Sequence, residues 1–315
     1  MRVLRSLTDQ PDPRGAVVAI GVFDGVHKGH QTEINAVRAE AARRGLAATV
    51  VTFDPHPARV LAPARAPQML QTLDQRLETF DLLGVDQVLV VPFTPDTALQ
   101  SAESFVAAIL VGDLGAKCVI TGQDFRFGRD REGDVAFLRA RGRERGFDVE
   151  GLPLAGDGER FSSTRIRALV QDGSVAHAAA LLGRPYTLRG SVAHGDARGG
   201  AELGFPTANL EVATEVIVPA IGIYAGAAVL DDGTRWPAAI SIGVRPQFYE
   251  DGHLLIEAHL VGFDGDLYET SVDLAFFERL RGEERYDSVE ALVAQIGRDV
   301  ARSQVIFEEF SVSDL

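Results

Sequence analysis

Residues 21–30 read GVFDGVHKGH and lie between a β-branched run, Ala16–Ile20, and a segment with helical periodicity that starts at Gln31. A strand, a glycine-rich turn and a helix start form an anion site, because the first helical turn directs unpaired backbone N–H groups at whatever occupies the turn. The glycines let backbone approach a ligand closely. His27 and His30 are three residues apart, so they fall on one side of the turn and can hydrogen-bond one phosphate group.

Length and charge limit the remaining possibilities. The chain has 315 residues, which fits two domains with ordinary cores, and a net charge of −14. That charge argues against a nucleic-acid or anionic-membrane partner, so a polyanionic substrate must be held by a local basic patch. Cys118 is the single cysteine and excludes an intrachain disulfide. The start of the chain lacks the apolar run of a signal peptide, and no run approaches the roughly 18 residues of a membrane span, so we expect a cytoplasmic protein.

Strands and helices alternate from residue 16 to residue 182. This pattern predicts a Rossmann-like, doubly wound parallel sheet with its ligands at the carboxyl ends of the strands. The expected strands are 16–20, 47–53, 87–93, 117–121 and 147–152, and the expected helices are 31–44, 74–83, 101–114 and 135–145.

Polar residues follow two further strands of this predicted sheet. Asp54 comes after one of them, and Asp124 and Arg126 come after another. Because parallel strands end at one edge of a sheet, these side chains are candidates for the same site as His27 and His30. A stiff proline turn at residues 54–57 and a solvated arginine loop are the competing structural explanations.

A second helix start with anion-binding character follows at residues 162–167, which read SSTRIR. The N–H groups there, with Ser163, Thr164 and Arg165, can hold another phosphate. Helix capping alone is a competing explanation.

The helical period ends at Gly183, which places the domain boundary between residues 1–182 and 183–315. The second part predicts a small closed antiparallel barrel with strands at 188–194, 222–230, 234–242, 254–261 and 271–280 and a hairpin turn at 231–233. It ends in a helix that starts at a capping box, residues 287–290. The expected buried stripe of that helix is Leu292, Val293, Ile296 and Val300.

Three polar residues of the barrel region are candidates for chemistry. Thr207 and Asn209 alternate onto one face of an extended segment, where their oxygens suit Mg²⁺ beside nucleotide phosphates. Glu257 lies in an apolar strand, and an inward carboxylate there suits a general base that takes a hydroxyl proton. An outward-facing glutamate on an alternating strand is the competing explanation.

Both halves together resemble the bacterial bifunctional riboflavin kinase/FAD synthetase family. In the first half the resemblance rests on residues 21–30, which match the nucleotidyltransferase signature, and on 52–57, 122–128 and 162–167. In the second half it rests on residues 204–210, 222–226, 241–243, 257–260, 263–268 and 280–281.

The resemblance implies two consecutive reactions. The barrel would transfer the γ-phosphoryl group of ATP to riboflavin with Glu257 as base and Mg²⁺ at Thr207 and Asn209, giving FMN. The sheet domain would then join FMN to the AMP part of a second ATP, releasing pyrophosphate and giving FAD, with His27 and His30 stabilising charge on the phosphates. The ligand-binding residues so implied are Gly21, Phe23, Asp24, Gly25, Gly29, Asp54, Asp124, Arg126, Ser163, Thr164, Arg165, Gly204, Phe205, Pro206, Thr207 and Asn209.

Two segments depart from the family pattern. Residues 198–204 are one residue longer than usual and lack a second arginine, and residues 245–248 read RPQF where the family has NPTF. Both lie in the kinase half and predict a weaker kinase or an altered choice of flavin. Two alternatives therefore stay open: a monofunctional adenylyltransferase with a flavin-binding barrel, and a related transferase acting on another phosphorylated acceptor. An oligomer is possible, but no residue pattern indicates one.

Overall fold

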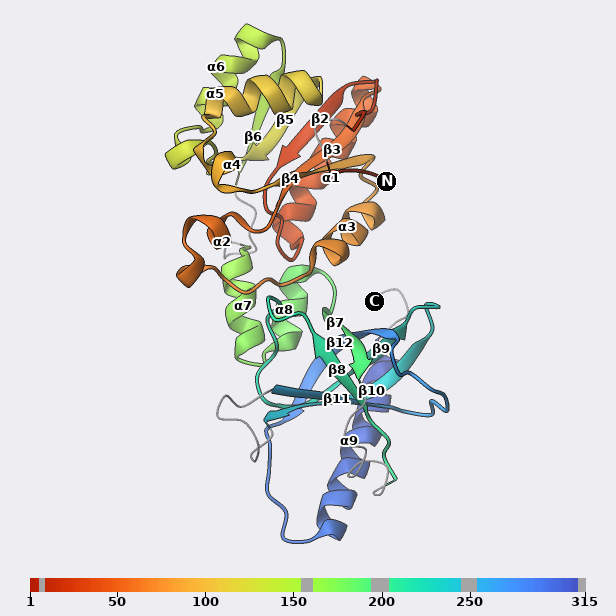
Figure 1. Cartoon of the computed structure of the whole chain (residues 1–315). Helices are drawn as coiled ribbons and strands as arrows, with labels where there is room; N and C mark the ends of the chain where they lie inside the picture. The colour runs from red at the N-terminus through yellow and green to blue at the C-terminus, as the bar shows by residue number, and fades with distance from the viewer. Residues whose placement is uncertain (6–8, 154–160, 194–203, 245–253, 311–315) are drawn as a thin grey trace. The chain divides into compact units, whose positions relative to one another are not determined.

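The computed structural model describes residues 1–5, 9–153, 161–193, 204–244 and 254–310. The chain forms two compact units. Unit 1 comprises Met1–Gln68 and Thr72–Ser162, and unit 2 comprises Met69–Gln71 and Ser163–Leu315. In Figure 1 the elements of unit 1 run from red to yellow-green, and those of unit 2 from green to blue. Among the described helices, none combines the length and the apolar composition needed to cross a membrane.

Unit 1 is built on a six-stranded parallel sheet, as the alternation of strands and helices predicts. The strand order is β1-β4-β3-β2-β5-β6. The strands are β1 (Arg2–Leu4), β2 (Ala16–Ile20), β3 (Ala47–Asp54), β4 (Gln87–Pro92), β5 (Ala116–Gly122) and β6 (Asp148–Leu152). Strand β1 was not predicted, because a three-residue edge strand is too short to show a period.

Helices cover both faces of this sheet. Successive side chains of β2 point to opposite faces, so Val17 packs with α1 and α3 while Val18 packs with α5, η2 and α6. Burial on both faces explains the continuous apolar strands. The helical elements of unit 1 are α1 (Lys28–Arg44), α2 (Pro57–Leu61), η1 (Pro63–Arg65), α3 (Leu73–Leu82), α4 (Pro95–Leu99), α5 (Ala102–Phe105), η2 (Val106–Asp113), η3 (Arg129–Arg131) and α6 (Val135–Arg145).

Two helices of unit 1 differ from the predicted ones. Helix α1 starts at Lys28 instead of residue 31, because the ring of His27 caps it by accepting a hydrogen bond from the His30 N–H. The helix predicted at 101–114 is a short α-helix, α5, that continues as the π-helix η2. The spacing of apolar residues identifies a helix but does not distinguish an α-helix from a π-helix.

Unit 2 contains a closed six-stranded antiparallel barrel, which confirms the predicted class. The strand order around the barrel is β10-β11-β8-β7-β12-β9. Its strands are β7 (Tyr186–Ala193), β8 (Ala208–Val212), β9 (Gly222–Leu230), β10 (Arg235–Val244), β11 (Leu254–Leu260) and β12 (Ser271–Arg281). The turn at residues 231–233 joins β9 to β10 as a hairpin.

Helices α7 (Ser163–Gln171) and α8 (Val175–Leu182) belong to unit 2 by packing. Ile166, Val170 and Ala178 are fully buried in the same apolar cluster as Leu188 and Ile240 of the barrel. The compact units therefore divide at Ser162, earlier than the domain boundary expected at residue 182. Chain periodicity marks where helices end, but it does not show which core they join.

The terminal helix α9 (Val289–Glu309) packs on the barrel through a different stripe from the predicted one. Leu292, Val293, Ile296 and Val300 are only half-buried, whereas Asp299, Ser303 and Ile306 are buried. Asp299 accepts two hydrogen bonds from the Arg281 guanidinium of β12, at 3.0 and 2.7 Å. The helix begins within the predicted range of residues 287–290: Ser288 is its N-cap residue, and the Ser288 hydroxyl accepts a hydrogen bond from the Ala291 N–H.

Candidate active sites in the two units

The loop of residues 21–27, called the His27 loop below, lies at the point where the strand order of the unit 1 sheet reverses. The chain leaves β2 here, and β3 and β5 are the two neighbours of β2. Ligands of open parallel sheets bind at such a reversal, outside the carboxyl ends of the strands. The loops after β3 and β5 carry Asp54 and Asp124, so the sheet topology brings the predicted polar residues to one edge.

His27 and His30 lie against each other, as their spacing predicts. Their rings stack with centroids 3.6 Å apart, and the edge of Phe23 contacts His30 at a centroid distance of 5.1 Å. Burial, and to a smaller extent the charge of His27, hold the pKa of His30 well below its usual value of 6.5. His30 is therefore neutral near pH 7, and its Nδ1 is buried without a hydrogen-bond partner among the described residues.

The His27 loop is held in an unusual backbone conformation. Phe23 and Val26 have positive φ angles of 54° and 38°, which side chains with a Cβ rarely adopt. Glycine allows close packing here: a Cβ at Gly21 would lie 3.2 Å from the Phe23 ring and one at Gly29 would lie 3.2 Å from the His27 ring, so both rings would have to shift. Backbone strain of this kind is concentrated at ligand-binding loops.

Arg76 of α3 is a residue of this region that the sequence interpretation missed. Its side chain is almost completely buried, at 1% exposure, and its Nη1 donates to the Val22 carbonyl oxygen at 2.6 Å. Nη2 lies 3.8 Å from Oδ1 of Asp54. The available signal was a charged residue beside Leu77 and Phe80 on the buried stripe of an amphipathic helix.

Glu33 of α1 is a second missed residue. Burial and the charge of Asp124 raise the pKa of Glu33 to about 8, although a hydrogen bond from the Gly122 backbone opposes the shift. Its Oε1 is buried without a partner among the described residues. Glu33 follows His30 by one helical turn, and this position next to buried Ile34 was the signal.

The other ligand-binding residues predicted for the first half are placed but not tested. Asp24 is buried, and Asp124 is exposed on the loop after β5. Arg126 forms an ion pair with Asp134, the N-cap residue of α6, at 2.7 Å. Ser163, Thr164 and Arg165 form the first turn of α7 in unit 2. Their contribution to nucleotide binding stays a prediction.

Asn209 and Glu257 face each other on neighbouring barrel strands. They are directly opposite in the β8–β11 ladder, and Ser241 of β10 is opposite Glu257 on its other side. Directly opposed residues share one face of a sheet. Ile256 and Ala258 enter the barrel core, so Glu257 lies on the outer face, and the prediction of an inward carboxylate was wrong.

Residues 204–209, called the Thr207 segment below, are anchored to β11 by His259. Its Nδ1 lies 2.8 Å from the Pro206 carbonyl oxygen, and its ring meets the Phe205 ring edge-on at 5.5 Å. Gly204 has a positive φ of 84°, where its missing Cβ relieves strain. His259 and Glu257 are two residues apart on one strand and therefore share its outer face.

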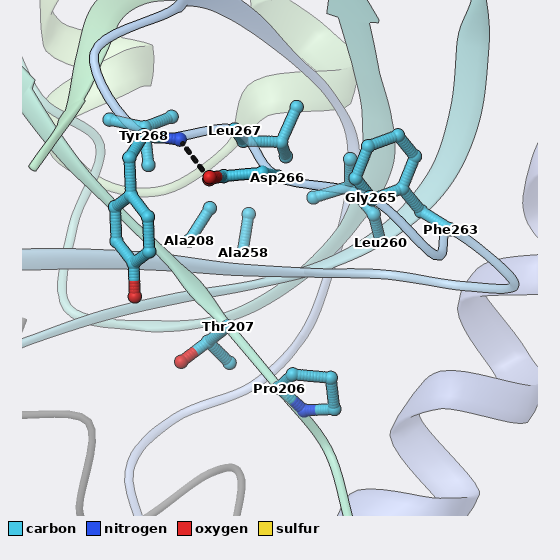
Figure 2. Close-up of a pocket in the computed structure, with 11 residues that line it drawn as sticks. Pro206, Thr207, Ala208, Ala258, Leu260, Phe263, Gly265, Asp266, Leu267 and Tyr268 are labelled. Atoms are coloured by element: carbon cyan, nitrogen blue, oxygen red, sulfur yellow. Dashed lines mark hydrogen bonds between the residues drawn. The ribbon is translucent and has the colours of Figure 1, made fainter. Parts of the chain in front are cut away.

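Thr207 lines a pocket beside the barrel of about 160 Å³ (Figure 2). The Tyr268 ring and the Thr207 hydroxyl lie on the same side of this pocket in Figure 2, and Phe263 closes the other side. Asp266 braces the covering loop by accepting a hydrogen bond from the Tyr268 N–H at 2.9 Å. A pocket smaller than the roughly 300–1,000 Å³ of whole-ligand sites takes one part of a substrate.

The polar side chains of Thr207, Asn209 and Glu257 have the chemistry that suits a hard cation. Thr207 offers a hydroxyl oxygen, Asn209 an amide oxygen and Glu257 a carboxylate, which are the ligand types that Mg²⁺ accepts when phosphates complete its shell. Among the residues that the structure describes, no group of three or more His, Cys, Asp or Glu side chains forms a metal site. The two segments that depart from the family pattern, residues 198–204 and 245–248, lie outside the described residues except for Gly204.

Comparisons with known proteins match a different family model to each half of the chain. Residues 9–165 match the family model described as FAD synthetase, and residues 182–307 match the one described as riboflavin kinase. A bifunctional riboflavin kinase/FMN adenylyltransferase of Pseudomonas fluorescens is 40% identical over 97% of this chain and 98% of its own length. The chain belongs to this bifunctional family.

Other members of the family match over similar lengths. The bifunctional riboflavin kinase/FMN adenylyltransferase of Escherichia coli K12 is 37% identical over 98% of this chain and 97% of its own. A crystal structure of a Streptococcus pneumoniae protein described as a macrolide-efflux protein superposes with a TM-score of 0.86 at 30% identity. It covers 96% of this chain and 98% of that one, so the likeness extends over both units.

Proposed function

We propose that this bifunctional enzyme makes FMN in unit 2 and FAD in unit 1. Unit 2 transfers the γ-phosphoryl group of ATP to the 5′-hydroxyl of riboflavin. Unit 1 joins the FMN phosphate to the α-phosphorus of a second ATP and releases pyrophosphate. The observation that carries the assignment is the presence of two separate polar sites, each within the residues matched by one of the two family models.

In the adenylyl transfer, unit 1 contributes positioning and charge stabilisation rather than a covalent intermediate. The start of α1 directs backbone N–H groups and the positive end of the helix dipole at the triphosphate. His27 and His30 stabilise the charge that develops as pyrophosphate leaves. A neutral His30 does so as a hydrogen-bond donor, because burial keeps its pKa below the working pH.

In the kinase reaction, Glu257 takes the proton of the attacking riboflavin hydroxyl. Asn209, directly opposite on β8, and Thr207 provide oxygens for Mg²⁺, which neutralises phosphate charge when it is bound. The pocket beside Thr207 holds one ring system of a substrate, and Phe263 and Tyr268 supply aromatic surface for it. The outer-face position of Glu257 suits this role, because a base must reach a substrate that enters from solvent.

Three further assignments belong to the proposal. Ser163, Thr164 and Arg165, in the first turn of α7, bind nucleotide phosphates for the adenylyl transfer. The substrates are small molecules, since a net charge of −14 disfavours nucleic acid. We place the enzyme in the cytoplasm, where both ATP and the flavin-dependent enzymes that use the products are found.

A direct assay tests the proposal. Purified protein is incubated with riboflavin, ATP and Mg²⁺, and FMN and FAD are followed by chromatography; a second reaction starts from FMN. We expect FMN and FAD in the first reaction and FAD in the second. FAD from FMN but nothing from riboflavin would contradict the kinase and make the barrel a flavin-binding module. No FAD from FMN would contradict the adenylyl transfer.

A further inference from the structure

The buried guanidinium of Arg76 connects three segments of unit 1. Nη1 donates to the Val22 carbonyl oxygen of the His27 loop at 2.6 Å and lies 3.3 Å from the Thr52 hydroxyl of β3. Nη2 lies 3.8 Å from the Asp54 carboxylate at the end of the same strand. One side chain thus contacts the ends of both β2 and β3, where the predicted nucleotide residues lie.

Stability alone does not account for an arginine at this position. The side chain is 1% exposed, its Nε is buried without a partner among the described residues, and the Asp54 carboxylate, 3.8 Å from Nη2, is half-exposed. Burial lowers the pKa of the Arg76 guanidinium, which is the mark of an unfavourable environment for its charge. Replacing a whole buried ion pair by apolar side chains is often neutral or stabilising, so a buried arginine is weak evidence of a purely structural role.

The hydrogen bonds to Val22 orient one peptide of the His27 loop. The Thr52 hydroxyl donates to the same carbonyl oxygen at 3.1 Å, so two donors hold it toward the guanidinium. In a trans peptide the following N–H points the opposite way, so the Phe23 N–H is directed away from Arg76. Phe23 has a positive φ of 54°, and no described group accepts a hydrogen bond from its N–H.

Arg76 also offsets negative charge at a site for polyanions. Asp24 and Asp54 are both close enough to act on the Arg76 guanidinium, and both belong to segments predicted to contact nucleotide. Two carboxylates without a nearby cation would repel a triphosphate. A cation fixed beneath the loop reduces that repulsion without occupying space that the ligand needs.

We infer that Arg76 is a positioning residue for adenylyl transfer: its buried guanidinium sets the Val22–Phe23 peptide and the Asp54 carboxylate in the arrangement that receives the ATP phosphates. The inference rests on the proposed function of unit 1. It gives Arg76 no contact with substrate; the residue acts through the His27 loop.

The test compares Arg76→Met and Arg76→Lys with the unmodified enzyme. Since misplacement of a catalytic group by about 1 Å lowers a rate about 100-fold, we expect kcat for FAD formation from FMN to fall about 100-fold in Arg76→Met. Arg76→Lys keeps the positive charge but loses the planar guanidinium, so its kcat for FAD formation should fall about 10-fold. The riboflavin kinase rate of the same protein should stay unchanged, and Arg143→Met, at an exposed arginine of α6, is the matched control.

A rescue experiment separates positioning from folding. Arg76→Ala leaves a cavity that guanidinium can enter. Millimolar guanidinium chloride should therefore raise the kcat of this variant for FAD formation at least 10-fold, whereas sodium chloride at the same concentration should not. Arg76→Met loses the cation beside buried Asp24 and should unfold at a lower temperature, so kcat is compared below the unfolding transition of each variant and per folded protein. The inference fails if Arg76→Met keeps kcat within threefold, or if activity falls only in proportion to unfolded protein. An unmodified enzyme that makes no FAD would instead reject the proposed function.

Discussion

The His27 loop of unit 1 and the Thr207 segment of unit 2 are both proposed to hold nucleotide phosphates, but they are supported in opposite ways. The His27 loop is largely buried, has two non-glycine residues with positive φ and is held by an arginine from a distant helix. The Thr207 segment is half to fully exposed and is held by the Asn209–Glu257 ladder pair and by His259.

This difference follows from the two architectures. A parallel sheet ends in loops enclosed between helices, so its site is built from buried backbone and needs internal donors such as Arg76. A small closed barrel is filled by its own side chains, so its polar residues lie on the outer face and at the rim. We therefore expect unit 1 to depend on residues remote from the substrate, and unit 2 to depend on residues that touch it.

The largest effect is expected for Glu257→Gln, which removes the proposed base and keeps the shape of the side chain. Loss of a general base lowers a rate by about 10²–10⁴-fold, so FMN formation from riboflavin should nearly stop while FAD formation from FMN continues. Glu278→Gln, at an exposed position of β12, is the control. A kinase rate within threefold of the unmodified enzyme would show that Glu257 is only an outer-face residue.

His30→Ala should produce the converse defect. Removal of one charge-stabilising donor costs about 10²–10³-fold in rate, so the variant should convert riboflavin to FMN and accumulate it. Chromatography of a riboflavin, ATP and Mg²⁺ reaction measures both products at once. Simultaneous loss of FMN and FAD formation would contradict independent sites.

A smaller effect is expected from His259→Ala, because His259 acts on the exposed Thr207 segment through one hydrogen bond and one ring contact. Loss of about 1 kcal/mol corresponds to about a fivefold rise in the kinase KM for ATP. His177→Ala, an exposed histidine of α8, is the control. A loss of kinase activity in His259→Ala as large as the loss of FAD formation expected in Arg76→Met would contradict the proposed difference between the Thr207 segment and the His27 loop.

The smallest effect concerns the pH dependence of stability in unit 1. Burial raises the pKa of Glu33 in the folded state to about 8 from its ordinary value of 4.5, so the folded state binds more protons between these values and its stability falls as the pH rises. Between pH 6.5 and 8.5 the loss should be about 1–2 kcal/mol. His30 acts in the opposite direction and only near the lower end of this window, because the unfolded state still binds a proton there with the ordinary pKa of 6.5 while burial keeps the folded His30 neutral.

Glu33→Gln should remove that decline, and Glu144→Gln, at an exposed position of α6, should leave it in place. Denaturant unfolding at pH 6.5 and 8.5 measures the difference. An equal decline in Glu33→Gln and in the unmodified protein would assign the effect to other groups.

The local elements were largely predictable because their signals are local. The strands at 16–20 and 222–230 and the helix at 135–145 depend on neighbours within a few residues. The predictions that failed concern contacts between distant segments. Alternation along β11 shows that Glu257 and Ile256 face opposite ways, but which of them enters the core depends on how the barrel closes.

The order of apolar, polar and glycine residues was enough to predict a parallel sheet followed by a barrel and the turn between β2 and α1, since strand period, helix period and turn chemistry act over a few residues. Long-range packing placed Arg76 beneath the His27 loop, Glu33 beside Asp124, and α7 and α8 in the core of the barrel unit. Those contacts join residues that are far apart in the sequence. They are set by how the helices and strands pack in the folded chain, and a local pattern around either residue does not identify its partner.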